Sequence, residues 1–145
     1  MRIVICASVD VTPKTKEISE TLIKMGHTVD IPHYSKKIID GEISFEDYLR
    51  IKGKDGDTAF REQAGTDLIK RHYNLIQNAD AILVVNVAKK GVENYIGGNT
   101  FLELGFAHIL NKKIFLLNPI PAVNYKDEIV AMNPTVVNND LTKII

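Results

Sequence analysis

AILVVNV, residues 81–87, is the most β-prone run in the chain. Apolar and β-branched side chains dominate it, which is typical of a buried strand of a parallel sheet. Asp80 precedes the run, and a polar loop follows over residues 88–98. We therefore predict that this segment lies in the centre of the sheet and that the other strands flank it.

Four other segments have the composition of short strands. RIVICAS, residues 2–8, is apolar on successive positions and is predicted to be covered on both faces. Residues 27–31 form a shorter and more polar run that stops at Pro32, so we place it near the edge of the sheet. The remaining two strands are expected at residues 113–117 and 135–137.

Helical patterns fill the intervals between these strands. Thr12 and Pro13 form a helix-start signal, and Gly26 ends the apolar spacing that follows. Residues 40–65 are rich in glycine and charge, and we expect a short helix there, a loop at residues 53–56, and either a lid or a plain surface connection. The helices are predicted at residues 12–26, 44–51, 57–77, 100–110 and 125–132.

Strands alternate with helices through most of the chain, and this order predicts the α/β class. The expected architecture is a three-layer, flavodoxin/Rossmann-like sheet of about five mostly parallel strands with helices on both faces. A length of 145 residues suits one globular domain that spans residues 1–145 and buries a core without disulfide or metal support.

The charge balance argues against polymeric partners. Eighteen Lys and Arg residues match eighteen Asp and Glu residues, which is no electrostatic footprint for nucleic acid or an anionic membrane. No apolar run approaches the length of a membrane span. The single cysteine, Cys6, lies in an apolar run, which fits a buried thiol in a reducing compartment. We expect a cytoplasmic protein that binds neither nucleic acid nor membrane.

Common cofactor and metal motifs are missing from the sequence. Residues 8–12, after the first predicted strand, lack the glycines of a dinucleotide-binding loop, and no GxxxxGK[ST] loop occurs. The four histidines show no HExxH spacing and Cys6 has no CxxC partner, so no zinc site is expected. GxSxG is also absent. The sequence therefore predicts neither a cofactor nor a metal.

GGNTFLELG, residues 97–105, combines backbone freedom with a carboxylate at the predicted start of a helix. It follows a central strand, at the rim where open α/β sheets bind ligands. Gly97 and Gly98 allow a ligand to approach the backbone, and free N–H groups at a helix start favour a phosphate or a carboxylate. The spacing of Thr100 and Glu103 also matches a capping box, in which both side chains serve the helix end. Spacing alone leaves both interpretations open.

GGNTFLELGFAHILNKKIFLLN, residues 97–118, resembles the signature of the nucleoside 2-deoxyribosyltransferase family. Members of that family carry a Gly-Thr-x-x-Glu-x-Gly-x-Ala helix start, then a turn and an apolar strand. The small residues at 6–8 and the Asn-Ala-Asp step at 78–80 resemble the same pattern. The resemblance implies one domain of this family over residues 1–145, assembled as a homo-oligomer, a dimer or higher.

The family resemblance implies an enzyme that cleaves or transfers the N-glycosidic bond of a nucleoside, a deoxynucleoside or a nucleoside 5′-monophosphate. Glu103 matches the family glutamate that attacks the anomeric carbon, as in a retaining glycosidase. Two family aspartates are missing: His72 stands at the position of one, and residues 94–97 lack the other. Asn99 replaces a usual glycine. His72 is the second catalytic candidate because imidazole titrates near neutral pH, although a helical histidine is often simply packed.

Substrate contacts are expected along the same rim of the sheet. They come from the end of the first strand, from the loop and helix start after the central strand, and from the end of the next strand. Tyr95 is suited to stacking on a base or to covering the loop. The predicted substrate-binding residues are Ser8, Tyr95, Gly97, Gly98, Asn99, Thr100 and Asn118.

Two other functions stay open. The missing aspartates would also suit a nucleotide-binding sensor of the same fold that has lost turnover. The run GGNTFLE, residues 97–103, further resembles the PGGxGTxxE motif of a phosphoribohydrolase group, although it lacks the leading proline and the second glycine.

Overall fold

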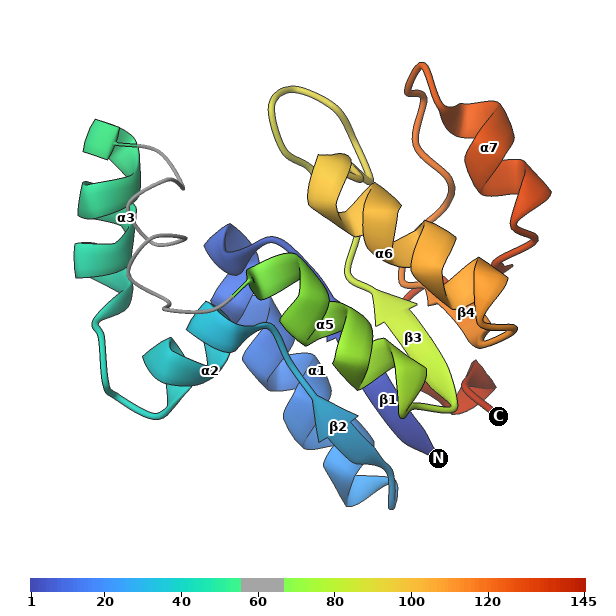
Figure 1. The fold of residues 1–145 in the computed structure, drawn as a ribbon, viewed down its shortest axis with the longest axis horizontal. Coiled ribbons are helices and arrows are strands. Elements are labelled where there is room, and N and C mark those ends of the chain that lie inside the picture. Colours follow the sequence, from blue (N-terminus) through green and yellow to red (C-terminus); the bar gives the residue numbers. More distant parts are fainter. Residues whose placement is uncertain (56–66) are drawn as a thin grey trace.

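The centre of the molecule is a five-stranded, all-parallel sheet in the computed structural model, which describes residues 1–55 and 67–145 (Figure 1). The strand order is β2-β1-β3-β4-β5, so the AILVVNV strand lies in the centre and the polar strand at an edge, as predicted. Each strand is a little shorter than predicted. The strands are β1 (Arg2–Cys6), β2 (Thr28–Asp30), β3 (Ala81–Val84), β4 (Lys113–Leu116) and β5 (Thr135–Val136).

Helices connect the successive strands and cover both faces of the sheet. Figure 1 shows α5 and α6 side by side in front of the sheet, with α1 behind it. Within the described residues, no helix is both long enough and apolar enough to cross a lipid bilayer. The helices are α1 (Thr12–Lys24), α2 (His33–Ile39), α3 (Phe45–Asp55), α5 (Leu68–Gln77), α6 (Gly98–Ile109) and α7 (Lys126–Ala131), with short 3₁₀ turns at Val9–Val11 and Leu141–Lys143.

Alternating side chains of the strands build one apolar cluster on each face of the sheet. Val4 and Cys6 of β1 face α5, α6 and α7, and the buried Ile76, Leu104 and Ile129 of those helices belong to the same cluster. On the other face, the strands pack against α1 and the C-terminal segment. Every residue of β3 is buried because both of its faces are covered. The predicted three-layer architecture is confirmed.

The register of the two central strands brings their carboxyl ends level with each other. Ile3 of β1 pairs with Ala81 of β3, and Cys6 pairs with Val84. The strand that follows β1 in the chain, β2, lies on one side of β1, whereas β3 lies on the other. At such a reversal of strand order, the connecting loops separate and leave a crevice at the carboxyl ends of the strands.

The start of α5 differs from the sequence prediction. This helix begins at Leu68, because Asp67 has an extended backbone and acts as the N-cap. Residues 57–66 of the predicted helix lie outside the described residues. The Asp67 carboxylate accepts hydrogen bonds from the N–H groups of Ile69 at 3.0 Å and Lys70 at 3.1 Å.

The structure also contains a helix, α2, that the sequence patterns did not predict. Its buried Tyr34 packs near Tyr48 of α3, with 6.4 Å between the ring centroids, and the two helices form a third apolar cluster. Because α3 continues to Asp55, the loop predicted at residues 53–56 is wrong for its first three residues. Residue 56 lies outside the described residues, and the suggested lid stays a prediction.

Asn86, two residues beyond β3, is fully buried and joins the ends of β3 and β4. Its Nδ2 donates hydrogen bonds to the carbonyl oxygens of Asn118 at 2.9 Å and Pro119 at 3.0 Å. Its Oδ1 accepts a hydrogen bond from the backbone N–H of Asn118 at 2.9 Å, and Asn118 Nδ2 donates to the Asn86 carbonyl at 2.9 Å. We call these contacts the Asn86 clamp.

We predict that Asn86→Ala lowers the free energy of unfolding by about 2–4 kcal/mol, because it leaves the backbone groups of Asn118 and Pro119 without partners. Urea unfolding measures the change. Asn74→Ala is the matched control, since the Asn74 side chain is exposed on α5, and its effect should stay within about 0.5 kcal/mol. Equal unfolding midpoints for the two variants would show that the clamp contributes little to stability.

Candidate active site

A cavity of about 290 Å³ lies at the carboxyl ends of β1 and β3. Small-molecule sites commonly occupy roughly 300–1,000 Å³, so this cavity is at the lower end of that range. Its walls come from the loops after both strands, from the start of α6, and from α2, α3 and α5. Glu103 is the one carboxylate among the described residues of these walls.

Most residues predicted to contact a substrate meet in this cavity. Asn118 does not line it; its Oδ1 accepts a hydrogen bond from Asn139 Nδ2 at 2.6 Å and its Nδ2 serves the Asn86 clamp. The predicted residues that do line the cavity, both catalytic candidates included, are Ser8, His72, Tyr95, Gly97, Gly98, Asn99, Thr100 and Glu103.

Glu103 lies in the second turn of α6 and does not cap this helix. The helix begins at Gly98, and its N-cap is Gly97, which makes no side-chain cap hydrogen bond. The predicted capping box is therefore wrong, because Thr100 is already inside the helix and Glu103 lies nearly two turns beyond the N-cap. The Glu103 carboxyl is left available for contacts between α6 and its neighbours.

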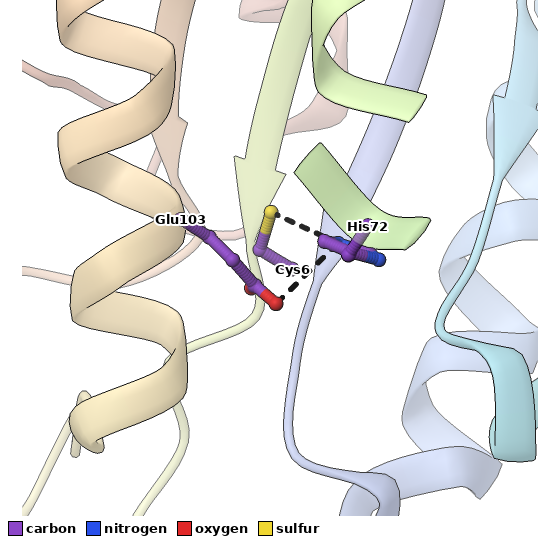
Figure 2. Close-up of side chains that lie close together, drawn as sticks. All are labelled: Cys6, His72 and Glu103. Carbon is purple, nitrogen blue, oxygen red and sulfur yellow. Dashed lines mark hydrogen bonds and ion pairs between the residues drawn. The ribbon is translucent and has the colours of Figure 1, made fainter. Parts of the chain in front are cut away.

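Cys6, His72 and Glu103 bring one polar group each from β1, α5 and α6 to a common point (Figure 2). His72 Nε2 lies 3.6 Å from Glu103 Oε1 and 3.6 Å from Cys6 Sγ. Cys6 is fully buried, and the side chains of His72 and Glu103 are only 9% and 17% exposed. The separation between Nε2 and Oε1 exceeds a normal hydrogen bond, so proton transfer between them requires the two groups to move closer.

Burial dominates the protonation of this cluster. Burial raises the pKa of Glu103 to about 8, while a hydrogen bond from Cys6 favours the ionised carboxylate. Burial lowers the pKa of His72 to about 4, although the charge of Asp30 favours the imidazolium. The pKa of the Cys6 thiol is raised by burial and further by Glu103. At neutral pH the cluster therefore holds uncharged groups, with a carboxyl proton beside an unprotonated imidazole.

A separate cluster of charged groups lies around Asp10. Lys52 Nζ donates a hydrogen bond to Asp10 Oδ1 at 2.8 Å, and Lys89 Nζ is 2.9 Å from Asp10 Oδ2. Lys89 also donates to Ser8 Oγ at 3.0 Å. Partial burial acts to raise the pKa of Asp10, but the hydrogen bonds and charges of the two lysines together lower it. Lys52, Lys89 and Ser8 all line the cavity, and no sequence pattern pointed to the two lysines.

Tyr95 covers the backbone just before α6. A Cβ atom at residue 97 would lie 3.3 Å from Cε1 of the Tyr95 ring, so the glycine at this position lets the ring approach closely. Lys90 Nζ lies 5.7 Å from the centroid of the same ring. An aromatic side chain in a cavity wall is suited to hold a planar group such as a nucleobase.

Glu103 and His72 can together supply a nucleophile and an acid. Transfer of the Glu103 proton to His72 Nε2 creates a carboxylate and an imidazolium without changing the net charge of the pair. The carboxylate can then attack an electrophilic carbon, and the imidazolium can protonate the leaving group. In retaining glycosidases a second carboxyl group has that acid role. Among the described wall residues, His72 is the group next to Glu103 that can perform it.

The sequence matches no protein-family model and no curated protein. Solved structures with a partly similar fold include the following two. A 2-deoxyribosyltransferase from Bacillus psychrosaccharolyticus is 20% identical, with a TM-score of 0.47 over 80% of this chain and 71% of that chain. The CMP N-glycosidase BcmB of Clostridium botulinum is 16% identical, with a TM-score of 0.49 over 94% of this chain and 85% of that chain. Each structure resembles this chain in fold, and the resemblance assigns the chain no activity.

We predict that Glu103→Gln stabilises the protein at neutral and alkaline pH by about 1–3 kcal/mol. The pKa of Glu103 is raised from 4.5 to about 8 in the folded state. Between these values the carboxyl ionises in the unfolded state but stays protonated in the folded state, so the free energy of unfolding of the original protein falls as the pH rises. The gain of the variant over the original protein should be smallest near pH 4.5 and largest above pH 8, because glutamine never ionises.

Urea unfolding at a series of pH values measures this gain. Glu20→Gln, at an exposed position of α1, serves as the control and should show no such trend. A stability difference for Glu103→Gln that does not change with pH would contradict the raised pKa of the buried carboxyl.

Proposed function

We propose that this protein is an enzyme that cleaves or transfers the N-glycosidic bond of a nucleoside, a deoxynucleoside or a nucleoside 5′-monophosphate, with Glu103 as the nucleophile. The observation that carries the proposal is the largely buried Glu103 carboxyl beside His72 in the cavity wall. The resemblance of residues 97–105 to the deoxyribosyltransferase signature supports the same role for Glu103. The proposed unit is one domain that works without a cofactor.

The first half of the proposed reaction uses the single proton of the Glu103 and His72 pair. The proton passes from Glu103 to His72 Nε2 as the two side chains approach each other. The Glu103 carboxylate then forms a bond to the anomeric carbon while the bond from that carbon to the base nitrogen breaks. The electron pair of the broken bond goes to the base, which takes the proton from His72. A glycosyl ester, a neutral imidazole and a free base result.

The second half releases the sugar. His72 takes a proton from the acceptor, which is either water or the N–H of a second base. The oxygen of the water or the nitrogen of that base attacks the anomeric carbon. The bond between that carbon and Glu103 breaks, and its electrons return to the carboxylate. The proton on His72 then returns to Glu103. Hydrolysis and base transfer thus differ only in the acceptor, and both restore the starting protonation state.

Substrate positioning in the proposed reaction falls to the remaining walls of the cavity. Tyr95 and the backbone at Gly97 and Gly98 suit the planar base. Ser8 and Lys89, joined by a hydrogen bond of 3.0 Å, suit a sugar hydroxyl or a 5′-phosphate. Since both substrate forms would use these groups, the proposal includes nucleosides and nucleotides.

The homo-oligomer expected from the family resemblance stays a prediction. Ile109 and Leu102 of α6 are 78% and 45% exposed, and Leu102 also lines the cavity. An apolar helix face next to the site is compatible with a second copy of the chain that covers it.

We predict that Glu103→Gln reduces the release of free base by at least ~10³-fold, because glutamine cannot form the glycosyl ester. Chromatography of nucleosides, deoxynucleosides and their 5′-monophosphates after incubation measures the release and identifies the substrate. Glu20→Gln, on the exposed face of α1, is the control and should keep the original rate.

Two results would contradict this assignment. Turnover that is unchanged in Glu103→Gln would remove Glu103 as the nucleophile. Saturable binding of a nucleotide to the original protein with no base released from any member of the panel would favour the sensor of the same fold.

We further predict a bell-shaped pH profile of kcat/KM. The protein is treated with a chelator first, so that adventitious metal ions do not affect the profile. The one-proton form of the pair exists between the pKa of His72, lowered to about 4, and the pKa of Glu103, raised to about 8, so activity should fall outside these limits.

His72→Asn should lower kcat/KM by roughly 10²–10⁴-fold, and its residual activity should rise with pH because Glu103 must then ionise by itself. A value of kcat/KM that still climbs above pH 9 in the original protein would refute the shared proton.

A further inference from the structure

We propose that Cys6, His72 and Glu103 form a binding site for a thiophilic divalent metal ion of the zinc type. The three side chains come from β1, α5 and α6, and their potential ligand atoms all lie within 4.8 Å of one another. The proposal concerns metal binding itself and does not depend on the glycosidic reaction.

The distances in the cluster fit a tetrahedral ion. Zinc bonds of about 2.3 Å to sulfur and 2.0–2.2 Å to nitrogen and oxygen place neighbouring ligand atoms about 3.4–3.6 Å apart. Both distances from His72 Nε2, to Glu103 Oε1 and to Cys6 Sγ, are 3.6 Å. The remaining pair, Cys6 Sγ and the Glu103 carboxylate oxygen, lies within 4.8 Å and needs to close by about 1.2 Å at most.

The charges of the ligands also suit a divalent ion. A thiolate and a carboxylate neutralise the ion completely, and the neutral imidazole completes the set, so the loaded cluster has no net charge in its buried surroundings. Binding releases two protons, one from the Cys6 thiol and one from the Glu103 carboxyl. Sulfur and imidazole ligands favour zinc or cobalt over magnesium or calcium, which prefer oxygen.

The fourth position of the ion would face the cavity. His72 and Glu103 line the cavity, whereas Cys6 lies beneath them at the end of β1. Three protein ligands and one open position are the arrangement of zinc sites that exchange a water or a small ligand, whereas purely structural zinc sites use four protein ligands. The cavity also provides the route by which an ion enters.

Cobalt titration of the chelator-treated, reduced protein tests the site by absorption spectroscopy. We expect a near-ultraviolet charge-transfer band of a cobalt thiolate together with visible bands of tetrahedral cobalt, saturating at stoichiometric metal and lost when zinc is added. Because Cys6 is the single cysteine of the chain, the charge-transfer band can arise from no other residue. This readout requires no variant and no activity.

Variants then identify the other two ligands. His72→Gln and Glu103→Gln should each weaken cobalt binding by at least roughly tenfold, and Cys6→Ala should abolish the charge-transfer band. His33→Gln is the matched control, because His33 lines the same cavity outside the cluster, and its affinity should be unchanged. Circular dichroism confirms that each variant is folded.

The proposal is overturned if the original protein shows no cobalt thiolate band, or if the visible bands are those of octahedral cobalt. It is also overturned if folded His72→Gln or Glu103→Gln binds cobalt as tightly as His33→Gln does, since the three-ligand site would then be wrong.

Discussion

Burying the carboxyl group of Glu103 costs free energy that its neighbours must offset. An ionised carboxylate with no partner is expensive in an apolar interior, and here the group lies between two helices packed on the sheet. Holding the proton avoids that cost and explains the raised pKa of this group. His72 lies 3.6 Å from this group, so its imidazole can accept the retained proton once the two side chains move closer.

The fold creates this contact because the helices before and after β3 in the sequence cover the same face of the sheet. α5 leads into β3 and α6 follows it, so both return to the same face of the sheet and pack against each other there. The parallel register of β1 and β3 then sets Cys6 beneath the two helices. The Asn86 clamp holds the loop after β4 against the end of β3. A site assembled in this way depends on the packing of the layers more than on any single loop.

Local sequence patterns predicted the strands, most helices and most residues of the cavity rim, but not the side-chain contacts that link distant segments of the chain. Apolar runs identified β1, β3 and β4, because a strand covered on both faces needs buried side chains along most of its length. Glu103 was found by resemblance, while its spacing to Thr100 pointed to a capping box that does not form. Cys6 was predicted only as a buried thiol, and the ion pairs of Asp10 with Lys52 and Lys89 left no local signal, since each joins segments far apart in the chain.

The proposed nucleophile and the proposed metal ligand are the same carboxylate, so the two uses exclude each other, and above the pKa of Glu103 they respond to pH in opposite ways. Glycosidic attack needs one proton kept within the Glu103 and His72 pair, a form that disappears above the pKa of Glu103 at about 8. Metal binding expels protons from Cys6 and Glu103, so its affinity rises with pH. A metal ion therefore competes less in the range in which the pair keeps its proton than at higher pH, and the shared Glu103 carboxylate links the two equilibria.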